Sequence, residues 1–457
     1  MKIYNTLTKD KDELKARDGK LRIFVCGPTV YDYSHIGHAR TYIAFDMFVK
    51  YMRLKHGMNV FYLQNITDID DKIINRSWEE KRTAEEVAKE YTKKYFEDMD
   101  SLGVDSVDKY APASKYIKEI IDQVQHLIDN DYAYPTDNGV YFRVKKFEGY
   151  GKLSGQKLDE MHEAVNIDED TTKEDPKDFA LWKKAKENEP QWDSPWGPGR
   201  PGWHIEDTAI AEKELGAQYE LHGGARDLIF PHHEAEIAQM EAAYNVEPMV
   251  EYWMHTGFLQ VGGEKMSKSL KNFTTIRDAL KVVSPQALRI FFTTKHYRSP
   301  IDYTEEGLEE SKKNEKRLIE FWINLQEKDV DDDIKSSKEI KTHLDDFWNF
   351  LEDDFNTPRA FAELFQLISY VNKQDKLSPD DKNAVLSFLE KLNNIFSVIN
   401  KRNLKFEIPK EIKDLAEKRE KARKNKQWED ADKFREEIEK KGYTIRDTDN
   451  GSEIRKK

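Results

Sequence analysis

The first 65 residues contain two short apolar runs separated by an amphipathic segment. Residues 21–26 (LRIFVC) predict a buried strand that ends at Gly27 and Pro28. Residues 37–47 carry apolar side chains at helical spacing, and residues 60–65 (VFYLQN) predict a second strand. A strand, a helix and a strand within about 45 residues are typical of a parallel βαβ unit. We therefore predict an α/β fold with a doubly wound, parallel, Rossmann-like sheet.

The pattern then changes along the chain and predicts further units. Residues 84–130 show helical periodicity, whereas residues 135–195 contain short strands and are interpreted as an insertion into the sheet domain. Helical periodicity dominates from residue 305 onward, and residues 442–446 predict a last strand. The predicted organisation is a sheet domain at 1–115 and 200–250, an inserted connective domain at 116–199, a loop region at 251–304, a helical bundle at 305–404 and a small α+β unit at 405–457.

Composition excludes several classes of protein. Aromatic residues make up 12% of the 457 residues, which is too many for a disordered chain. The single cysteine, Cys26, excludes a disulfide scaffold and a four-thiolate zinc site. No stretch approaches the roughly 20 apolar residues of a membrane span, and the first residues show no signal-peptide pattern. We expect a cytoplasmic protein without a membrane partner.

Charge is distributed unevenly along the chain. The net charge is −13, yet residues 401–457 hold 19 Lys and Arg against 14 Asp and Glu, which leaves −18 for the preceding 400 residues. A basic tail on an acidic body can bind a polyanion locally. A solvated, charged helix is the alternative interpretation.

Two short motifs carry candidate chemistry. His35 and His38 stand at the start of the first predicted helix, where free N–H groups favour phosphate and two imidazoles can donate hydrogen bonds to a triphosphate. Gly37 between them lets a nucleobase approach the backbone. Lys265 and Lys268 lie in the segment KMSKS after two glycines, where a mobile loop can close over the triphosphate. Each motif alone is also compatible with ordinary surface residues, but together they resemble the two signature motifs of class I aminoacyl-tRNA synthetases.

Longer segments are similar to the cysteinyl-tRNA synthetases. They are residues 26–32 (CGPTVYD), 65–72 (NITDIDDK), 200–206 (RPGWHIE), 221–224 (LHGG), 230–234 (FPHHE), 354–358 (DFNTP) and 427–432 (QWEDAD). The resemblance extends from about residue 2 to the C-terminus. It implies a monomeric ligase that activates cysteine with ATP and Mg²⁺ and transfers it from the adenylate to the 3′ end of tRNA-Cys.

The resemblance also implies a zinc site, with one departure. In this family two cysteines, a histidine and a glutamate hold a zinc ion that binds the thiolate of the substrate. The matching positions are Cys26, Asp207, His232 and Glu236, so an aspartate replaces the second cysteine. Aspartate is also a zinc ligand, but a harder one than cysteine. The site therefore binds zinc and cysteine, binds zinc but accepts a different or broader set of substrates, or has lost the metal.

Further roles follow from the same resemblance. Thr67 and Trp203 are expected to line the amino-acid pocket. The residues expected at the nucleotide are Gly37, His222, Gly223, Gly224, Asp227 and Lys268. The resemblance makes the helical bundle and the basic tail the parts that contact tRNA, with residues 405–457 as the anticodon-binding domain. It also makes residues 251–304 the region of the lysine loop and of contacts with the tRNA stem. A ligase of the same fold with another acceptor, such as a small amine, and a non-catalytic tRNA-binding paralogue remain as alternatives.

Overall fold

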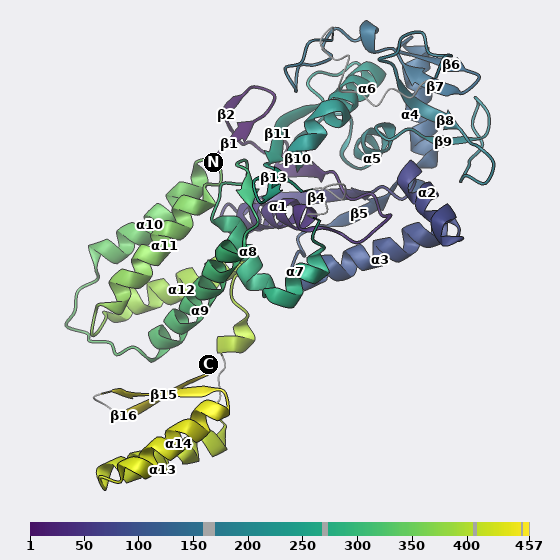
Figure 1. The fold of residues 1–457 in the computed structure, drawn as a ribbon. Helices are drawn as coiled ribbons and strands as arrows, with labels where there is room; N and C mark the ends of the chain where they lie inside the picture. Colours follow the sequence, from purple (N-terminus) through teal and green to yellow (C-terminus); the bar gives the residue numbers. More distant parts are fainter. Residues whose placement is uncertain (159–169, 267–272, 405–408, 449–450, 457) are drawn as a thin grey trace. The chain divides into compact units, whose positions relative to one another are not determined.

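The computed structural model describes the chain except for residues 159–169, 267–272, 405–408, 449–450 and 457. The chain forms two compact units, Met1–Ile399 and Asn400–Lys457, each of which is described by itself (Figure 1). Within the described part of the chain, no helix is both long enough and apolar enough to cross a membrane.

The larger unit is built on a five-stranded sheet that confirms the predicted fold class. Its strand order is β11-β10-β3-β4-β5, and every neighbouring pair is parallel. The strands are β3 (Lys20–Val25), β4 (Asn59–Ile66), β5 (Lys109–Pro112), β10 (Tyr219–Ala225) and β11 (Val250–Thr256). The earliest strand of the sheet is central, so later strands are added on both sides of it, as in doubly wound folds.

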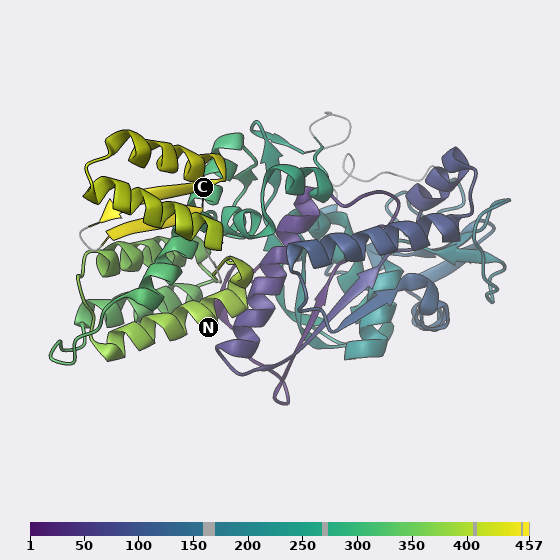
Figure 2. The ribbon, with the colours of Figure 1, turned by 90° about the horizontal axis from the view of Figure 1, so that it is seen from below.

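Helices cover both faces of this sheet (Figures 1 and 2). On one face, Ile210 and Met240 pack with Phe24 of the central strand in one apolar core. On the other face, Tyr42 and Tyr95 meet edge to face with ring centroids 5.7 Å apart. The covering helices are α5 (Ile205–Leu215) and α6 (Glu234–Tyr244) on the first face and α1 (Ile36–Leu54) and α3 (Ala84–Leu102) on the second.

The helical periodicity predicted for residues 84–130 is correct for α3 and α4 (Ile117–Asp129) but missed one strand. Strand β5 interrupts it between α3 and α4 and pairs in parallel with β4. Of the four residues of β5 only Ala111 is buried, so the strand carries no apolar alternation. A short edge strand of this kind is held by backbone hydrogen bonds to its neighbour, which leave no mark on the sequence.

A second, antiparallel sheet lies within the segment predicted as an insertion. Its order is β6-β7-β8-β9, and Val124 of α4 packs in one core with Phe142 and Leu181 of these strands. The strands are β6 (Ala133–Thr136), β7 (Gly139–Phe142), β8 (Phe179–Lys184) and β9 (Gly199–Pro201). After β9 the chain continues directly into α5, which covers the parallel sheet.

Short elements and a helical bundle complete the larger unit. They are the hairpin β1 (Lys2–Asn5) and β2 (Asp10–Glu13), the helix α2 (Asp71–Glu80), the strands β12 (Leu259–Val261), β13 (Glu264–Lys265) and β14 (Ile301–Asp302), and the helices α7 (Ile276–Val282), α8 (Pro285–Thr293), α9 (Glu305–Glu327), α10 (Lys338–Glu352), α11 (Thr357–Asn372) and α12 (Pro379–Phe396). The buried Arg289 of α8 links the parts: it donates to the carbonyl oxygens of Phe396 (2.6 Å) and Leu102 (3.0 Å) and to Asp46 (2.6 Å). The guanidinium of Arg289 therefore joins the bundle to the sheet domain.

The smaller unit has its own core. It contains α13 (Lys410–Lys424), α14 (Trp428–Lys440), β15 (Tyr443–Thr448) and β16 (Gly451–Lys456), and the two strands pair antiparallel. Ile412, Leu415 and Ile438 form the centre of its core. Trp428 at the start of α14 stands outside this core, with 59% of its surface exposed.

Candidate active site and metal-ligand cluster

A cavity of about 350 Å³ opens at the carboxyl ends of the central strands. Cys26 follows β3 directly, Thr67 follows β4 and Ala225 ends β10, and all three line the cavity. Parallel α/β sheets bind ligands at this edge, because neighbouring strands lead their connections away to opposite faces there. Predicted site residues that line the cavity are Cys26, His35, Gly37, His38, Thr67, Trp203, Asp207, Asp227 and His232.

The two histidines of the first motif cap helix α1. His35 is the N-cap, and its Nδ1 accepts a hydrogen bond from the backbone N–H of His38 (3.3 Å), while Nδ1 of His38 accepts one from His35 (3.4 Å). The rings stack with centroids 3.8 Å apart. A Cβ on Gly37 would lie 2.8 Å from the His35 ring, so this arrangement requires glycine. Burial lowers the pKa of His38, which keeps its ring neutral.

The lysine motif is described only in part. Lys265 lies in β13, which pairs with β12, and the next residue, Met266, lines the cavity close to Gly37. The position of Lys268 is outside the described residues. The described part of this segment therefore reaches the cavity beside the start of α1.

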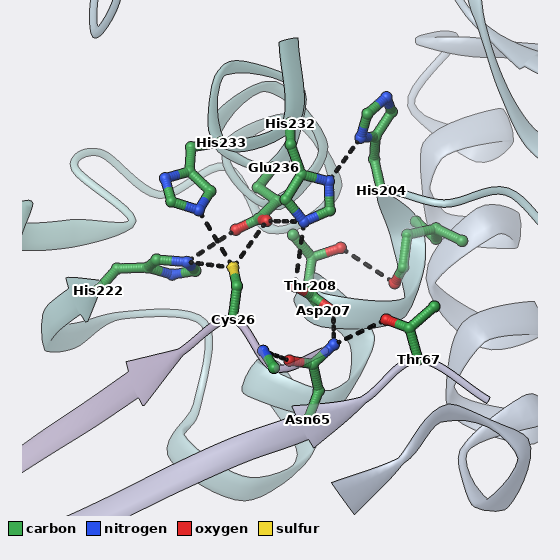
Figure 3. Close-up of polar contacts among 12 residues, drawn as sticks. Cys26, Asn65, Thr67, His204, Asp207, Thr208, His222, His232, His233 and Glu236 are labelled. Atoms are coloured by element: carbon green, nitrogen blue, oxygen red, sulfur yellow. Dashed lines mark hydrogen bonds and ion pairs between the residues drawn. The ribbon is translucent and has the colours of Figure 1, made fainter. Parts of the chain in front are cut away.

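The four residues predicted as metal ligands converge beneath the cavity (Figure 3). Their ligand atoms lie within 4.8 Å of one another, and all four side chains are buried. Nε2 of His232 is 3.1 Å from Oδ2 of Asp207 and 2.8 Å from Oε1 of Glu236, and Sγ of Cys26 is 3.8 Å from the same Oε1. We call Cys26, Asp207, His232 and Glu236 the outer cage.

Burial disfavours the negatively charged forms of the outer-cage ligands Cys26 and Glu236, and a bound cation would offset this effect. Burial raises the pKa of the Cys26 thiol, and Glu236 and Asp207 raise it further. Burial raises the pKa of Glu236 to about 7. Burial lowers the pKa of His232, but Glu236 and Asp207 outweigh this effect and raise it to about 10. A divalent cation would take over the role of the imidazolium and hold the thiolate and carboxylates in their charged forms.

Asp207 has a partner that the sequence analysis missed. Nδ2 of Asn65, at the end of β4, donates to Oδ1 of Asp207 (2.5 Å) and to Oγ1 of Thr67 (3.2 Å), and its Oδ1 accepts from the backbone N–H of Gly27 (2.5 Å). Asn65 thus joins the strand ends to the outer cage. Its place in the segment NITDIDDK, at the carboxyl end of a strand, was the available signal.

The two residues expected at the amino acid lie next to this cage. The ring of Trp203 stacks on His232 with centroids 4.4 Å apart, and 41% of its surface is exposed. Thr67 is buried and meets Asn65 at its hydroxyl. Both line the cavity, so the structure brings them together with the outer cage.

The residues expected at the nucleotide separate into two groups. Asp227 lines the cavity, after the end of β10. The ring of His222, which we expected beside the adenosine, is instead completely buried and points at Cys26, 3.4 Å from its Sγ. Gly223 and Gly224 lie in β10, where a Cβ would meet the ring of Phe45 at 2.2 Å or that of His233 at 3.0 Å. The inward direction of His222 follows from the strand pleat, which the motif alone does not reveal.

Three features of the larger unit indicate one class of protein. A doubly wound parallel sheet, a cavity at its carboxyl edge, and His35 and His38 capping the helix after the central strand are the architecture of a class I aminoacyl-tRNA synthetase. Solved structures agree at the level of the fold. The methionyl-tRNA synthetase of Mycobacterium tuberculosis in complex with methionyl-adenylate superposes with a TM-score of 0.60 at 13% identity, over 82% of this chain and 88% of that one. A putative arginyl-tRNA synthetase of Campylobacter jejuni gives 0.58 at 12% identity, over 84% and 93%.

Sequence comparisons narrow the class to a family. The family model of the class I (C) tRNA synthetase catalytic domain matches residues 13–313, the DALR domain matches 346–400, and the cysteinyl-tRNA ligase anticodon binding domain matches 406–455. A cysteine–tRNA ligase of Pyrococcus abyssi is 45% identical over 98% of this chain and 97% of its own length. One of Coxiella burnetii is 44% identical over the whole of both chains. The chain belongs to the cysteine–tRNA ligase family.

Proposed function

We propose that the protein ligates cysteine to the 3′ end of tRNA-Cys in two steps that consume ATP. The cysteine carboxylate attacks the α-phosphate of ATP, which gives cysteinyl-adenylate and pyrophosphate. The terminal ribose hydroxyl of the tRNA then takes the cysteinyl group. The observation that carries the proposal is the buried cluster of Cys26, His232 and Glu236, of which Cys26 and His232 line the same cavity as His35 and His38, in a chain similar over its full length to cysteine–tRNA ligases.

The protein's own part in activation is positioning and electrostatic stabilisation. His35 and His38 donate hydrogen bonds to the phosphates at the N-terminus of α1, where the helix dipole also favours negative charge. Lys265 and Lys268 neutralise charge on the leaving pyrophosphate, and Mg²⁺ accompanies ATP as its phosphate-bridging ion. Gly37 and the backbone of Gly223 and Gly224 belong to the adenosine side of the site, where Asp227 accepts a hydrogen bond from a ribose hydroxyl.

The chemistry of the outer cage fits zinc, of which we expect one per chain. It offers one thiolate, one imidazole and two carboxylates, all of them zinc ligands, in a buried cluster where burial disfavours the charged forms of Cys26 and Glu236. When bound, zinc supplies a ligand position that a thiolate fills well and a serine hydroxyl fills poorly. Trp203 forms the wall of the amino-acid pocket, and Thr67 supplies a polar contact.

The remaining parts of the chain are assigned to tRNA. Residues 405–457 are the anticodon-binding domain, supported by the family match to residues 406–455 and by the net positive charge of this tail. The helical bundle at 305–404 contacts the body of the tRNA, the inserted domain at 116–199 connects the two halves of the catalytic domain (1–115 and 200–250), and residues 251–304 carry the lysine loop. We expect a monomer that works in the cytoplasm, where tRNA is charged.

The proposal is tested by ATP–pyrophosphate exchange with each standard amino acid, with zinc measured on the same preparation. Exchange with cysteine alone and about one zinc per chain support it. Exchange with serine or another amino acid would contradict the cysteine specificity and make Asp207 a specificity change. Cysteine-dependent exchange that survives complete removal of metal would contradict the role of the outer cage.

A further inference from the structure

A second group of four ligand side chains lies directly behind the outer cage. Cys26, His222, His233 and Glu236 also place their ligand atoms within 4.8 Å of one another, and all four are buried. Nε2 of His222 and Nε2 of His233 lie 3.4 Å and 3.1 Å from Sγ of Cys26. We call this group the inner cage. It shares Cys26 and Glu236 with the outer cage and replaces Asp207 and His232 by two other histidines.

Glu236 faces the two cages with different oxygens (Figure 3). Its Oε1 lies 2.8 Å from Nε2 of His232 in the outer cage, and its Oε2 lies 3.2 Å from Nε2 of His222 in the inner cage. Oε2 is fully buried and makes no hydrogen bond to any described residue. A buried carboxylate oxygen without a hydrogen bond is costly, and a cation between it and the two imidazoles would satisfy it.

In both histidines of the inner cage, the ring nitrogen that faces away from the cage has a hydrogen-bond partner, as is usual for metal-ligating histidines. Nδ1 of His222 lies 2.6 Å from the hydroxyl of Tyr219. Nδ1 of His233 lies 2.8 Å from Nε2 of His255, whose own Nδ1 lies 2.7 Å from the hydroxyl of Thr6. When Nδ1 of each ring is protonated, it donates a hydrogen bond, from His222 to Tyr219 and from His233 to His255. The Nε2 atoms of His222 and His233 then carry lone pairs that face the inner cage.

We propose that the inner cage is a second metal position, and that it holds the divalent cation while no amino acid is bound. Its two anionic ligands, Cys26 and Glu236, balance the charge of a divalent ion, whereas the outer cage supplies a third anion, Asp207. In a buried site the neutral complex has the smaller desolvation cost. The inner cage also offers two imidazoles in place of one, and zinc prefers nitrogen and sulfur ligands over additional carboxylates.

The two cages differ in access to the substrate. Cys26, Asp207 and His232 of the outer cage line the cavity, whereas Cys26 alone does so among the ligands of the inner cage, so the inner position is the less accessible of the two. A thiolate in the cavity can add a second sulfur ligand to the outer cage only. In this chain, where Asp207 stands in place of a cysteine, the substrate itself would complete the thiolate pair and favour the outer position.

This inference extends the metal site of the proposed function, and its test needs no catalysis, so the two can fail separately. X-ray absorption of the full-length chain, loaded with one zinc and free of amino acid, should show two imidazole ligands and one sulfur. A single imidazole with one sulfur would overturn the inference, whatever the pyrophosphate exchange shows. With cobalt(II) in place of zinc, the visible spectrum should change when cysteine is added and stay the same when serine is added. An unchanged spectrum with cysteine would overturn the inference that the metal moves from the inner to the outer cage when cysteine binds.

Matched histidine variants give a second test. His222→Gln and His233→Gln should each lower zinc affinity in the amino-acid-free protein by at least about a hundredfold, measured by chelator competition. His232→Gln, which removes a ligand of the outer cage alone, should lower it less than about tenfold. A loss in His232→Gln equal to or larger than that in the other two would overturn the inference. Melting curves identify a variant that fails to fold, and the absorption measurement on the unsubstituted chain then decides.

Discussion

Asn65 donates a hydrogen bond from Nδ2 to Oδ1 of Asp207 at 2.5 Å. With Oδ1 engaged, Oδ2 is the oxygen that faces His232, at 3.1 Å, and the one available to a metal. A cysteine offers one ligand atom, the sulfur, whereas an aspartate offers two carboxylate oxygens. Asn65 therefore gives an aspartate at position 207 one defined orientation toward the outer cage.

We predict that Asn65→Ala weakens the use of cysteine without emptying the metal site. The free Asp207 carboxylate would turn away from the outer cage. Loss of a residue that orients a metal ligand typically lowers metal affinity or activity 10–100-fold. The KM for cysteine in pyrophosphate exchange should therefore rise about 10–100-fold, while zinc content without amino acid stays near that of the unsubstituted chain, because the inner cage is intact.

Gln64→Ala is the matched control for Asn65→Ala. Gln64 precedes Asn65 in β4, is equally buried, and accepts a hydrogen bond from Tyr95 (2.6 Å) on the opposite face of the strand. The control should lose some stability and keep its KM for cysteine. An equal rise in KM in both variants would mean that the effect is a general loosening of the strand.

The lysine loop provides a prediction about activation. Lys268→Ala should lower the rate of cysteine-dependent pyrophosphate exchange about 10²–10³-fold, the usual loss when one preorganised transition-state contact is removed. The melting temperature should be unchanged. Lys281→Ala removes an exposed lysine of α7 that pairs with Asp278, and it should leave exchange unaltered. Undiminished exchange in Lys268→Ala would remove the loop from the mechanism.

Much of the site could be predicted from the sequence because its chemistry is attached to strand ends. Cys26 and Thr67 each follow an apolar run that reads as a strand, and a parallel sheet brings such ends to one edge. The spacing of His232 and Glu236 places them one helical turn apart. These local rules predict where the cavity lies and which of these side chains share it.

The inner cage could not be predicted in the same way. His222 lies in β10, His233 precedes α6 and His255 lies in β11, and their rings meet only through the packing of these three elements. The direction of each ring depends on strand pleat and on the close approach allowed by Gly224, neither of which a motif states. Strand β5 could not be predicted either, because it is held by backbone hydrogen bonds to β4 and its side chains show no apolar alternation.

The buried pair of Asp46 and Arg289 predicts a pH-dependent stability. Burial alone raises the pKa of Asp46, but Arg289 at 2.6 Å and Lys50 at 3.0 Å outweigh it and lower the pKa below its ordinary value. The contribution of a carboxylate with a lowered pKa is fully present above the unfolded value of about 3.9 and is lost as the pH falls through the folded value. Asp46→Asn should cost about 3–5 kcal/mol at pH 7, because Arg289 is left buried without its partner.

Denaturant unfolding from pH 8 to pH 3 measures this effect. The difference between Asp46→Asn and the unsubstituted chain should be constant above about pH 5 and should shrink in acid. Asp105→Asn is the control: Asp105 also pairs with Lys50 but is exposed, so its loss should cost less than about 1 kcal/mol. A penalty for Asp46→Asn that does not shrink between pH 5 and pH 3 would assign the effect to packing and not to charge.

The exposed Trp428 predicts a separable contact with RNA. Its ring lies outside the apolar core of Asn400–Lys457, and Lys421 and Lys424 lie close before it in the chain. Stacking of one base on an aromatic ring contributes about 1–3 kcal/mol. Trp428→Ala should therefore raise the KM for tRNA in aminoacylation about 5–150-fold and leave cysteine-dependent pyrophosphate exchange unchanged, since that reaction needs no tRNA.

Trp78→Ala removes a comparably exposed tryptophan from α2 of the larger unit and should change neither value. An unaltered KM for tRNA in Trp428→Ala, with the unit folded, would leave the tail's recognition of tRNA to its charged side chains alone.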